Sequence, residues 1–189
     1  MSYTEIYAFG KDGNAYLFKE INNSWRGAMA IWTVLEEKYL PQYRPSYVPP
    51  SVLDSELKDY CNYKPSRCGA IFDKKAMQEI WDLVNGDLMT PEERIVLATT
   101  FDKVIIARKD VLDTIDAFNK FEGDTSLKEQ AEILQEMYDQ GDIIAVGWNQ
   151  TSVNGDNWEN FSYDEDEEEY TPYNVLTGTE HQFIFKGDI

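Results

Sequence analysis

Hydrophobic and polar positions along the chain predict a series of short strands and amphipathic helices. Two β-like stretches, 5–9 and 15–21, flank the turn-forming residues 10–14, which predicts an N-terminal hairpin. Apolar residues at helical spacing then predict a helix from Trp25 to Leu40, with N-cap residues at 22–24 and Pro41 at its end. The proline-rich residues 41–52 predict a loop, and 53–72 are ambiguous.

The second half of the chain carries stronger start and stop signals. A helix is predicted to follow Asp73 and to close at Asn85 and Gly86, and two capping boxes, Thr90 with Glu93 and Ser126 with Glu129, open further helices. The first of these helices runs to about residue 99 and the second ends at glycine 141. Helical spacing also predicts a helix over 111–121, and strands are predicted at 102–108, 143–148 and 181–186.

These elements predict one α+β domain over residues 1–189. Its small, mostly antiparallel sheet packs against four or five helices, with an acidic insertion at about 159–171 before the last strand. Alternation of helix and strand between Thr90 and Trp148 leaves a local parallel crossover open as an alternative. The length of 189 residues, the 42% of apolar residues and the 14% of aromatic residues suffice for a packed core.

Charge is concentrated near the end of the chain. From Asp156 onward there are ten acidic residues and one basic residue, which is half of the formal net charge of −18. Six carboxylates are consecutive: Asp164, Glu165, Asp166, Glu167, Glu168 and Glu169. Such a block normally stays solvated and disordered, repels nucleic acids and anionic lipid, and attracts basic surfaces. We therefore expect a basic protein surface as partner, and no direct nucleic-acid binding.

Several classes of site lack their signature. The run has none of the glycine spacing of a calcium loop, so no dedicated metal site is expected. No phosphate loop and no GxGxxG motif is present, and no cofactor is expected. Cys61 and Cys68 form neither a CxxC pair nor a disulfide framework and are expected to be reduced thiols. The sequence shows no signal peptide and no membrane-spanning apolar run, which favours the cytoplasm and no membrane contact.

An enzyme remains an alternative. The polar residues that follow the predicted strand 143–148 form a possible ligand loop, because ligand contacts often lie at strand ends; they are Trp148, Asn149, Gln150, Thr151, Ser152 and Asn154. The same side chains can simply satisfy backbone groups of a turn. His181, the only histidine, could pair with either cysteine, but no motif supports the pairing, and no catalytic residue is assigned.

Three stretches, 25–32, 124–131 and 145–154, resemble uncharacterised small proteins encoded by phages and prophages of Gram-positive bacteria. The resemblance covers about the first four-fifths of the chain and excludes the acidic insertion. It implies no activity and no functional residue. It implies a setting in the cytoplasm of a bacterial host, where small phage proteins often bind host or phage proteins.

Three hypotheses follow. The first is a non-enzymatic interaction protein whose acidic face engages a basic host or phage protein, in its strongest form as a DNA mimic. The second is a small-molecule or nucleotide-related enzyme that uses the loop 148–154. The third is a structural or assembly component of a phage, built through contacts between copies. The sequence favours the first and leaves the oligomeric state open.

Overall fold

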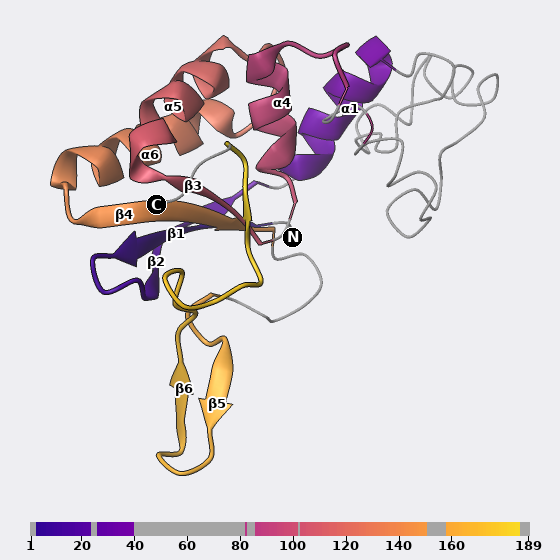
Figure 1. Ribbon diagram of the computed structural model, residues 1–189. Coiled ribbons are helices and arrows are strands. Elements are labelled where there is room, and N and C mark those ends of the chain that lie inside the picture. The colour runs from indigo at the N-terminus through magenta and orange to yellow at the C-terminus, as the bar shows by residue number, and fades with distance from the viewer. Residues whose placement is uncertain are drawn as a thin grey trace, which may run out of the picture.

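The computed structural model describes residues 3–23, 26–39, 82, 86–101, 103–150 and 158–185 (Figure 1). Its helices are α1 (Ala28–Tyr39), α4 (Pro91–Ala98), α5 (Val111–Lys120) and α6 (Leu127–Gln140), and a short 3-10 helix, η2 (Arg108–Asp110), precedes α5. Its strands are β1 (Tyr3–Gly10), β2 (Ala15–Asn22), β3 (Val104–Ala107), β4 (Ile143–Asn149), β5 (Ser162–Asp164), β6 (Glu169–Thr171) and β7 (Gln182–Phe183).

Five of the strands form one sheet in the order β2-β1-β4-β3-β7. Every neighbouring pair is antiparallel except β3 with β7, and β5 and β6 form a separate antiparallel pair. The four described α-helices and this mostly antiparallel sheet confirm the predicted α+β class. The alternative of a local parallel crossover is wrong, because β3 and β4 are antiparallel, with Ile105 opposite Gly147. Two consecutive helices, α5 and α6, join these strands and reverse the chain direction.

The N-terminal hairpin forms as predicted. Its turn contains Gly13 at a φ of 85°, a conformation that glycine adopts without a steric penalty. The pairing of β1 with β2 shifts between Ile6 and Tyr7, which leaves Phe18 without a direct partner as a β-bulge. Alternation along β1 sends Ile6 and Ala8 to one face of the sheet and Tyr7 and Phe9 to the other.

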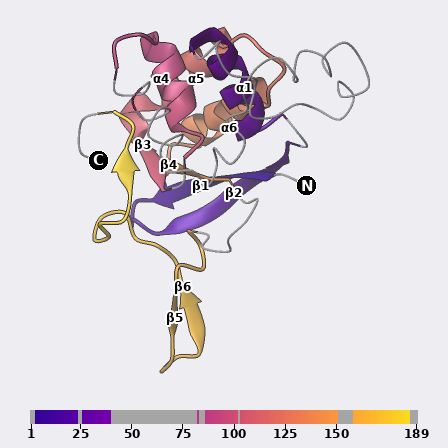
Figure 2. The same ribbon diagram turned by 90° about the vertical axis from the view of Figure 1, so that its right-hand side faces the viewer.

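The four described α-helices lie on one face of the sheet (Figures 1 and 2). Their apolar stripes and that face of the sheet form the larger core, whose fully buried members include Ile6, Ile31, Leu35, Leu97, Ile106, Phe118, Leu134 and Trp148. Burial of such side chains, at about 25 cal/mol per Å² of apolar surface, is what holds the helical layer on the sheet.

Of the two predicted capping boxes, one forms in the structure and the other does not. At α4 the predicted capping box forms: the Thr90 hydroxyl accepts a hydrogen bond from the Glu93 N–H, and the Glu93 carboxylate accepts one from the Thr90 N–H. At α6 the predicted box is wrong, because Ser126 has a ψ of 5° rather than an extended one and makes no capping hydrogen bond. Its hydroxyl instead accepts a hydrogen bond from Gln130 Nε2 at 3.0 Å. The predicted ends of α4, α5 and α6 agree with the structure within three residues.

The first helix begins at Ala28, later than predicted. Asn23, one of the expected N-cap residues, turns its amide into the protein and donates a hydrogen bond to the Thr4 hydroxyl. The helix predicted after Asp73 lies outside the described residues apart from Asp82, which is helical, and so do the loop 41–52 and residues 53–72.

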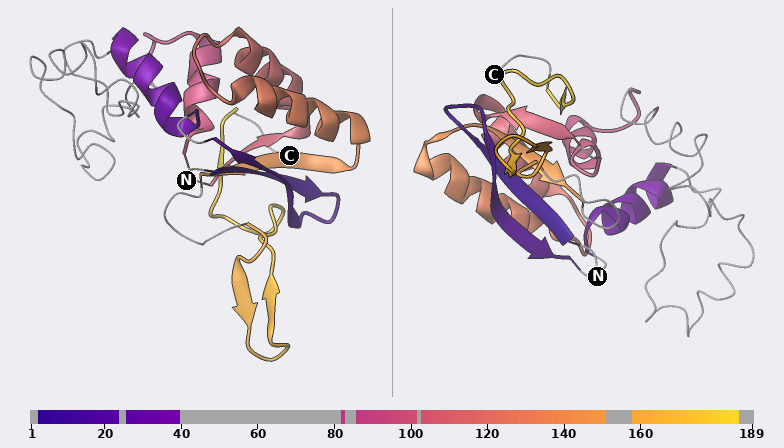
Figure 3. Two further views of the ribbon diagram at one scale, coloured as in Figure 1. Left: turned by 180° about the vertical axis from the view of Figure 1, so that it is seen from behind. Right: turned by 90° about the horizontal axis from the view of Figure 1, so that it is seen from below.

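The C-terminal part of the chain covers the opposite face of the sheet (Figure 3). Trp158, Tyr173 and Val175 pack there against Tyr7 and Phe9, and Trp158 and Phe9 meet edge to face at 5.5 Å. Backbone hydrogen bonds fix this segment to the hairpin, from Ala15 N–H to the Tyr173 carbonyl and from Val175 N–H to the Gly13 carbonyl. The molecule therefore has a layer of helices, a sheet and a covering segment. From that segment β5 and β6 project away from the body (Figure 1).

Candidate functional site

The acidic run lies in the projecting pair of strands, which we call the arm (residues 162–171). Three cross-strand pairs build it: Ser162 opposite Thr171, Tyr163 opposite Tyr170 and Asp164 opposite Glu169. The predicted acidic insertion before the last strand is therefore a hairpin whose first and last carboxylates belong to strands and whose middle four form the turn.

The turn at the tip follows from the residues that compose it. Asp164 Oδ1 accepts hydrogen bonds from the backbone N–H groups of Asp166 at 2.9 Å and of Glu167 at 3.3 Å. An aspartate that caps the following backbone in this way nucleates a turn. Glu168 has a φ of 55°, and this left-handed residue brings the chain back into β6. The tip thus has a defined path that holds its carboxylates together.

All six carboxylates are exposed, and none forms an ion pair with a cation among the described residues. Asp164 and Glu169 lie directly opposite each other, an arrangement that destabilises a two-stranded pair. The arm therefore keeps like charges close together, and no cation among the described residues neutralises them. A cationic partner would relieve this repulsion.

Two large aromatic side chains lie on the same arm. Tyr163 is 52% exposed and Tyr170 is 62% exposed, and their rings meet edge to face at 5.1 Å. Because side chains alternate along a strand, this tyrosine pair lies on one face of the arm, and the pairs on either side of it lie on the other face.

The base of the arm is firmly anchored. Phe161 donates its backbone N–H to the Thr171 carbonyl, and its ring packs against Tyr173 at 4.8 Å. Trp158 is buried and donates its indole N–H to the Trp148 carbonyl at 3.2 Å. The acidic tip is consequently carried at a distance from the body on a fixed base.

The described part of the predicted ligand loop is occupied by structural contacts. Trp148 donates its indole N–H to Gln130 Oε1 at 3.1 Å, and Asn149 Nδ2 donates to the Glu5 carboxylate at 3.2 Å. Gln150 Nε2 donates to the Thr99 carbonyl at 3.1 Å, and Gln150 Oε1 accepts from the Thr4 hydroxyl in β1. These hydrogen bonds tie the end of β4 to its neighbours. Thr151, Ser152 and Asn154 lie outside the described residues.

His181 lies at the edge of the C-terminal segment. Its Nδ1 and the Tyr173 hydroxyl are 2.6 Å apart and share a hydrogen bond, and the ring packs edge to face on Phe183 at 5.1 Å. Burial lowers the pKa of His181 below its usual value of 6.5. The two cysteines that could pair with it lie outside the described residues. In the structure, then, His181 holds Tyr173 in place.

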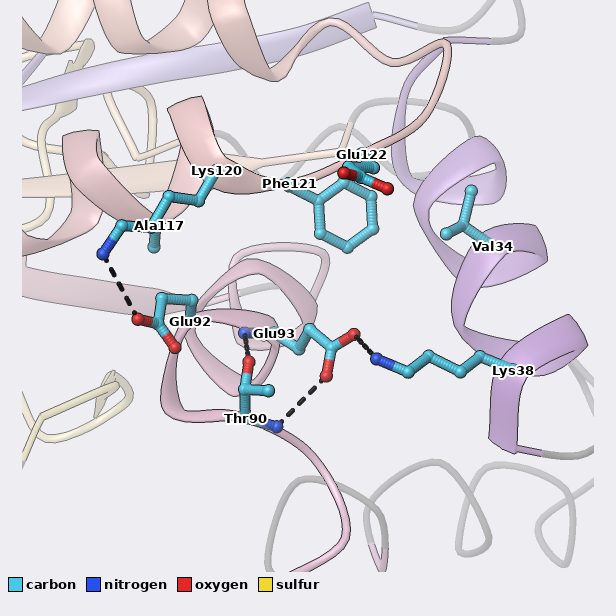
Figure 4. A pocket seen from close by; sticks show the side chains of 9 residues that line it. All are labelled: Val34, Lys38, Thr90, Glu92, Glu93, Ala117, Lys120, Phe121 and Glu122. Atoms are coloured by element: carbon cyan, nitrogen blue, oxygen red, sulfur yellow. Dashed lines mark hydrogen bonds and ion pairs between the residues drawn. The ribbon is translucent and has the colours of Figure 1, made fainter.

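A cavity of about 340 Å³ lies where α1, α4 and α5 meet (Figure 4). Its apolar lining is Val34, Ala117 and Phe121; its polar lining is Lys38, Thr90, Glu92, Glu93, Lys120 and Glu122. No sequence pattern predicted this cavity, because its lining comes from three helices and its charged residues are spaced as on any solvent-facing helix.

Ion pairs between helices account for most of the charges at this cavity. Lys38 Nζ lies 2.6 Å from one Glu93 oxygen, and Lys120 Nζ lies 3.4 Å from Glu92. Burial opposes ionisation of Glu93, but hydrogen bonds from Lys38, from the Tyr39 hydroxyl and from the Thr90 N–H outweigh it and lower the pKa. The contacts of Glu93 fasten α1 to the start of α4, and the pair of Lys120 with Glu92 joins α5 to α4. The charged side chains around the cavity therefore hold the three helices together.

The described residues contain no group of three or more His, Cys, Asp or Glu side chains placed to hold a metal ion. Among them, no helix is both long enough and apolar enough to cross a membrane. The chain matches no protein-family model, and no curated protein and no solved structure shows a significant match to it.

Proposed function

We propose that this chain is a non-enzymatic protein-interaction module whose acidic arm engages a basic surface of another protein. One observation carries the proposal: six exposed carboxylates, without a described counter-ion, are presented at the end of a hairpin that projects from the body (Figure 1). A partner can reach such a hairpin from several sides without any change in the core. The stretches that resemble small phage proteins supply the setting, a bacterial cytoplasm in which the partner is a phage or host protein.

Electrostatics determines what kind of partner fits. With a net charge of −18, the chain repels nucleic acids, anionic membranes and other copies of itself at long range. Cationic proteins are attracted, and charge complementarity of this kind accelerates association and makes it sensitive to salt. At about 0.5 M NaCl the screening length falls to about 4 Å, so binding that depends on the arm should be lost.

The test is a capture experiment from bacterial lysate at low and at high salt, with bound proteins identified by mass spectrometry. The arm variant carries Glu165→Gln, Asp166→Asn, Glu167→Gln and Glu168→Gln. The matched control changes four exposed carboxylates of α6 in the same way, with Glu129→Gln, Glu132→Gln, Glu136→Gln and Asp139→Asn. Both variants shift the net charge equally, so they separate the arm from the overall field.

We expect a basic protein that binds the native chain and the α6 control at low salt, and that is lost from the arm variant and at high salt. Equal binding to the arm variant and to the native chain would show that the arm is not the interaction site. Equal loss from both variants would show that net charge, rather than the arm, drives the association.

A further inference from the structure

The tyrosine pair of the arm has no role in the core of the protein. Tyr163 and Tyr170 contact each other across the hairpin, and each leaves more than half of its surface in solvent. The arm is joined to the covering segment at its base, where the Phe161 N–H donates to the Thr171 carbonyl, and its strands pair with each other rather than with the main sheet. Two exposed aromatic rings beside six carboxylates form a mixed surface that binding can cover.

Charge complementarity determines what covers this face. A second copy of the chain would bring another net charge of −18 and another acidic tip to the contact. Nucleic acid and anionic lipid carry the same sign of charge. A cationic protein segment is the occupant that both the carboxylates and the rings attract, because the face of a tyrosine ring is negative and attracts a cation above it.

We propose that the arm recognises an arginine-rich segment in extended conformation, and that Tyr163 and Tyr170 select arginine over lysine. This inference rests on the proposed function and names the partner chemistry of the same site. The guanidinium group is planar and weakly hydrated, stacks on an aromatic ring, and forms two parallel hydrogen bonds with a carboxylate. Lysine presents a compact, strongly hydrated charge and gains less from the rings.

The backbone of the arm favours an extended segment. Among the described strands, β5 and β6 pair only with each other, so each offers an outer edge to an added strand. Side chains of an added strand alternate between the two faces of the hairpin. Arginines at every second position would then meet the tyrosine face together, while those between them would meet Asp164 and Glu169 on the other face.

The test measures binding of two fluorescent ten-residue peptides, one of arginine and one of lysine, by anisotropy at low salt. Four forms of the full chain are compared: the native chain, Tyr163→Thr/Tyr170→Thr, Tyr163→Phe/Tyr170→Phe, and the arm variant with the four tip carboxylates neutralised. Threonine keeps the strand propensity without the ring, whereas phenylalanine keeps the ring. Circular dichroism of each form checks that the body is folded.

The native chain should bind the arginine peptide about fivefold more tightly than the lysine peptide, and the Phe form should keep this preference. In the Thr form the ratio should fall to the smaller preference that the carboxylates alone give to a guanidinium, with the affinity for lysine little changed. Equal affinities on the native chain, or a preference that is as large in the Thr form as in the native chain, would overturn the inference. The proposed function has a separate readout: it fails if neutralising the tip leaves the affinity for both peptides unchanged.

Discussion

At the scale of single residues, Trp148 connects the helical layer with the segment that covers the opposite face of the sheet. Its side chain is fully buried, packs edge to face on Phe118 at 6.2 Å and donates to Gln130 Oε1, while its backbone carbonyl accepts from the Trp158 indole. Gln130 is itself buried and reaches on to Ser126. The side chain predicted as part of a ligand loop thus occupies the centre of a buried polar network.

Replacing this indole should be costly. In Trp148→Phe the Gln130 carbonyl oxygen loses its donor and part of the core volume is left empty, so we expect a loss of about 2 kcal/mol in the free energy of unfolding. Urea unfolding followed by circular dichroism measures the loss. Tyr170→Phe, on the exposed arm, should change stability by less than about 0.5 kcal/mol. In a double-mutant cycle with Gln130→Met the two losses should not add; full additivity would show that the hydrogen bond contributes nothing.

His181 should make stability depend on pH. Because burial lowers its pKa in the folded protein, the folded state favours the neutral imidazole, whose Nδ1 shares a hydrogen bond with the Tyr173 hydroxyl. The stabilisation is complete above the unfolded pKa of 6.5 and is lost as the pH falls through the lower, folded pKa. The titratable groups next to His181 are Tyr173, which shares its hydrogen bond, and the preceding residue Glu180, which forms an ion pair with Lys103.

The measurement is the free energy of unfolding between pH 8 and pH 5, compared with His181→Asn. Asparagine can still share a hydrogen bond with the Tyr173 hydroxyl but does not titrate in this range. Native protein should therefore lose more stability than the variant as the pH falls below about 6.5. Parallel curves would show that protonation of His181 does not act on the fold, since carboxylates titrate in both proteins.

At the scale of elements, the two capping boxes separate local from tertiary control. Thr90 is exposed, has the extended ψ of 157° that a cap needs, and forms both hydrogen bonds of the box. Ser126 is buried, and its N–H is held by the Arg26 carbonyl at 2.8 Å. The chain that precedes α1 therefore fixes Ser126 in a conformation that cannot cap. A sequence pattern cannot show this, because the two residues in contact are far apart along the chain.

Loss of the formed cap should be measurable. Thr90→Ala should reduce the free energy of unfolding by about 1 kcal/mol, because the N–H of Glu93 loses its acceptor at the start of α4. Thr90→Ser keeps an oxygen in the same place and should cost much less. Thermal and urea unfolding of both variants would check this. An equal loss in the two variants would attribute the effect to the methyl group rather than to the cap.

Local signals account for the parts of the fold that the sequence predicted. The hairpin of β1 and β2, the strand at 104–107 and the helices α5 and α6 each follow from periodicity and turn residues within one segment. Strand order, the parallel pairing of β3 with β7 and the cavity in Figure 4 depend on contacts between distant segments. A block of six acids normally stays disordered because its charges repel, and the sequence left open whether this run is ordered. The pairing of Tyr163 with Tyr170 and the Asp164 turn support a hairpin there.

At the scale of the whole molecule, charge and core are separated in space. The core clusters draw on the main sheet, the helices and the covering segment, and no residue of the arm contributes to them. The arm carries six of the ten acidic residues found from Asp156 to the end of the sequence. The arm thus adds charge and exposed aromatic surface but no buried residue to the protein. Under the proposed function its contribution is to binding, and the fold should not depend on it.

Excision of the arm tests this separation. Replacing residues 162–171 by Asn-Gly, which suits a two-residue hairpin turn, should leave the melting temperature within about 2 °C of the native value, because the arm buries no residue and its base is joined to the body by the hydrogen bond from the Phe161 N–H to the Thr171 carbonyl. At low salt the loss of six like charges also removes repulsion. By contrast, Trp158→Ala beneath the arm removes a buried indole that contacts Phe9 and Tyr173, and should cost about 3 kcal/mol or more.

The two variants together separate stability from binding. The arm-free protein should melt like the native chain and fail to retain the basic partner, whereas Trp158→Ala should melt lower and still bind it below its transition. Calorimetry and the low-salt capture experiment measure both properties on the same preparations. A large fall in melting temperature on excision would make the arm part of the folded body. If the arm-free protein still retains the partner, the interaction must lie on another surface, because the partner then does not recognise the charges of the arm.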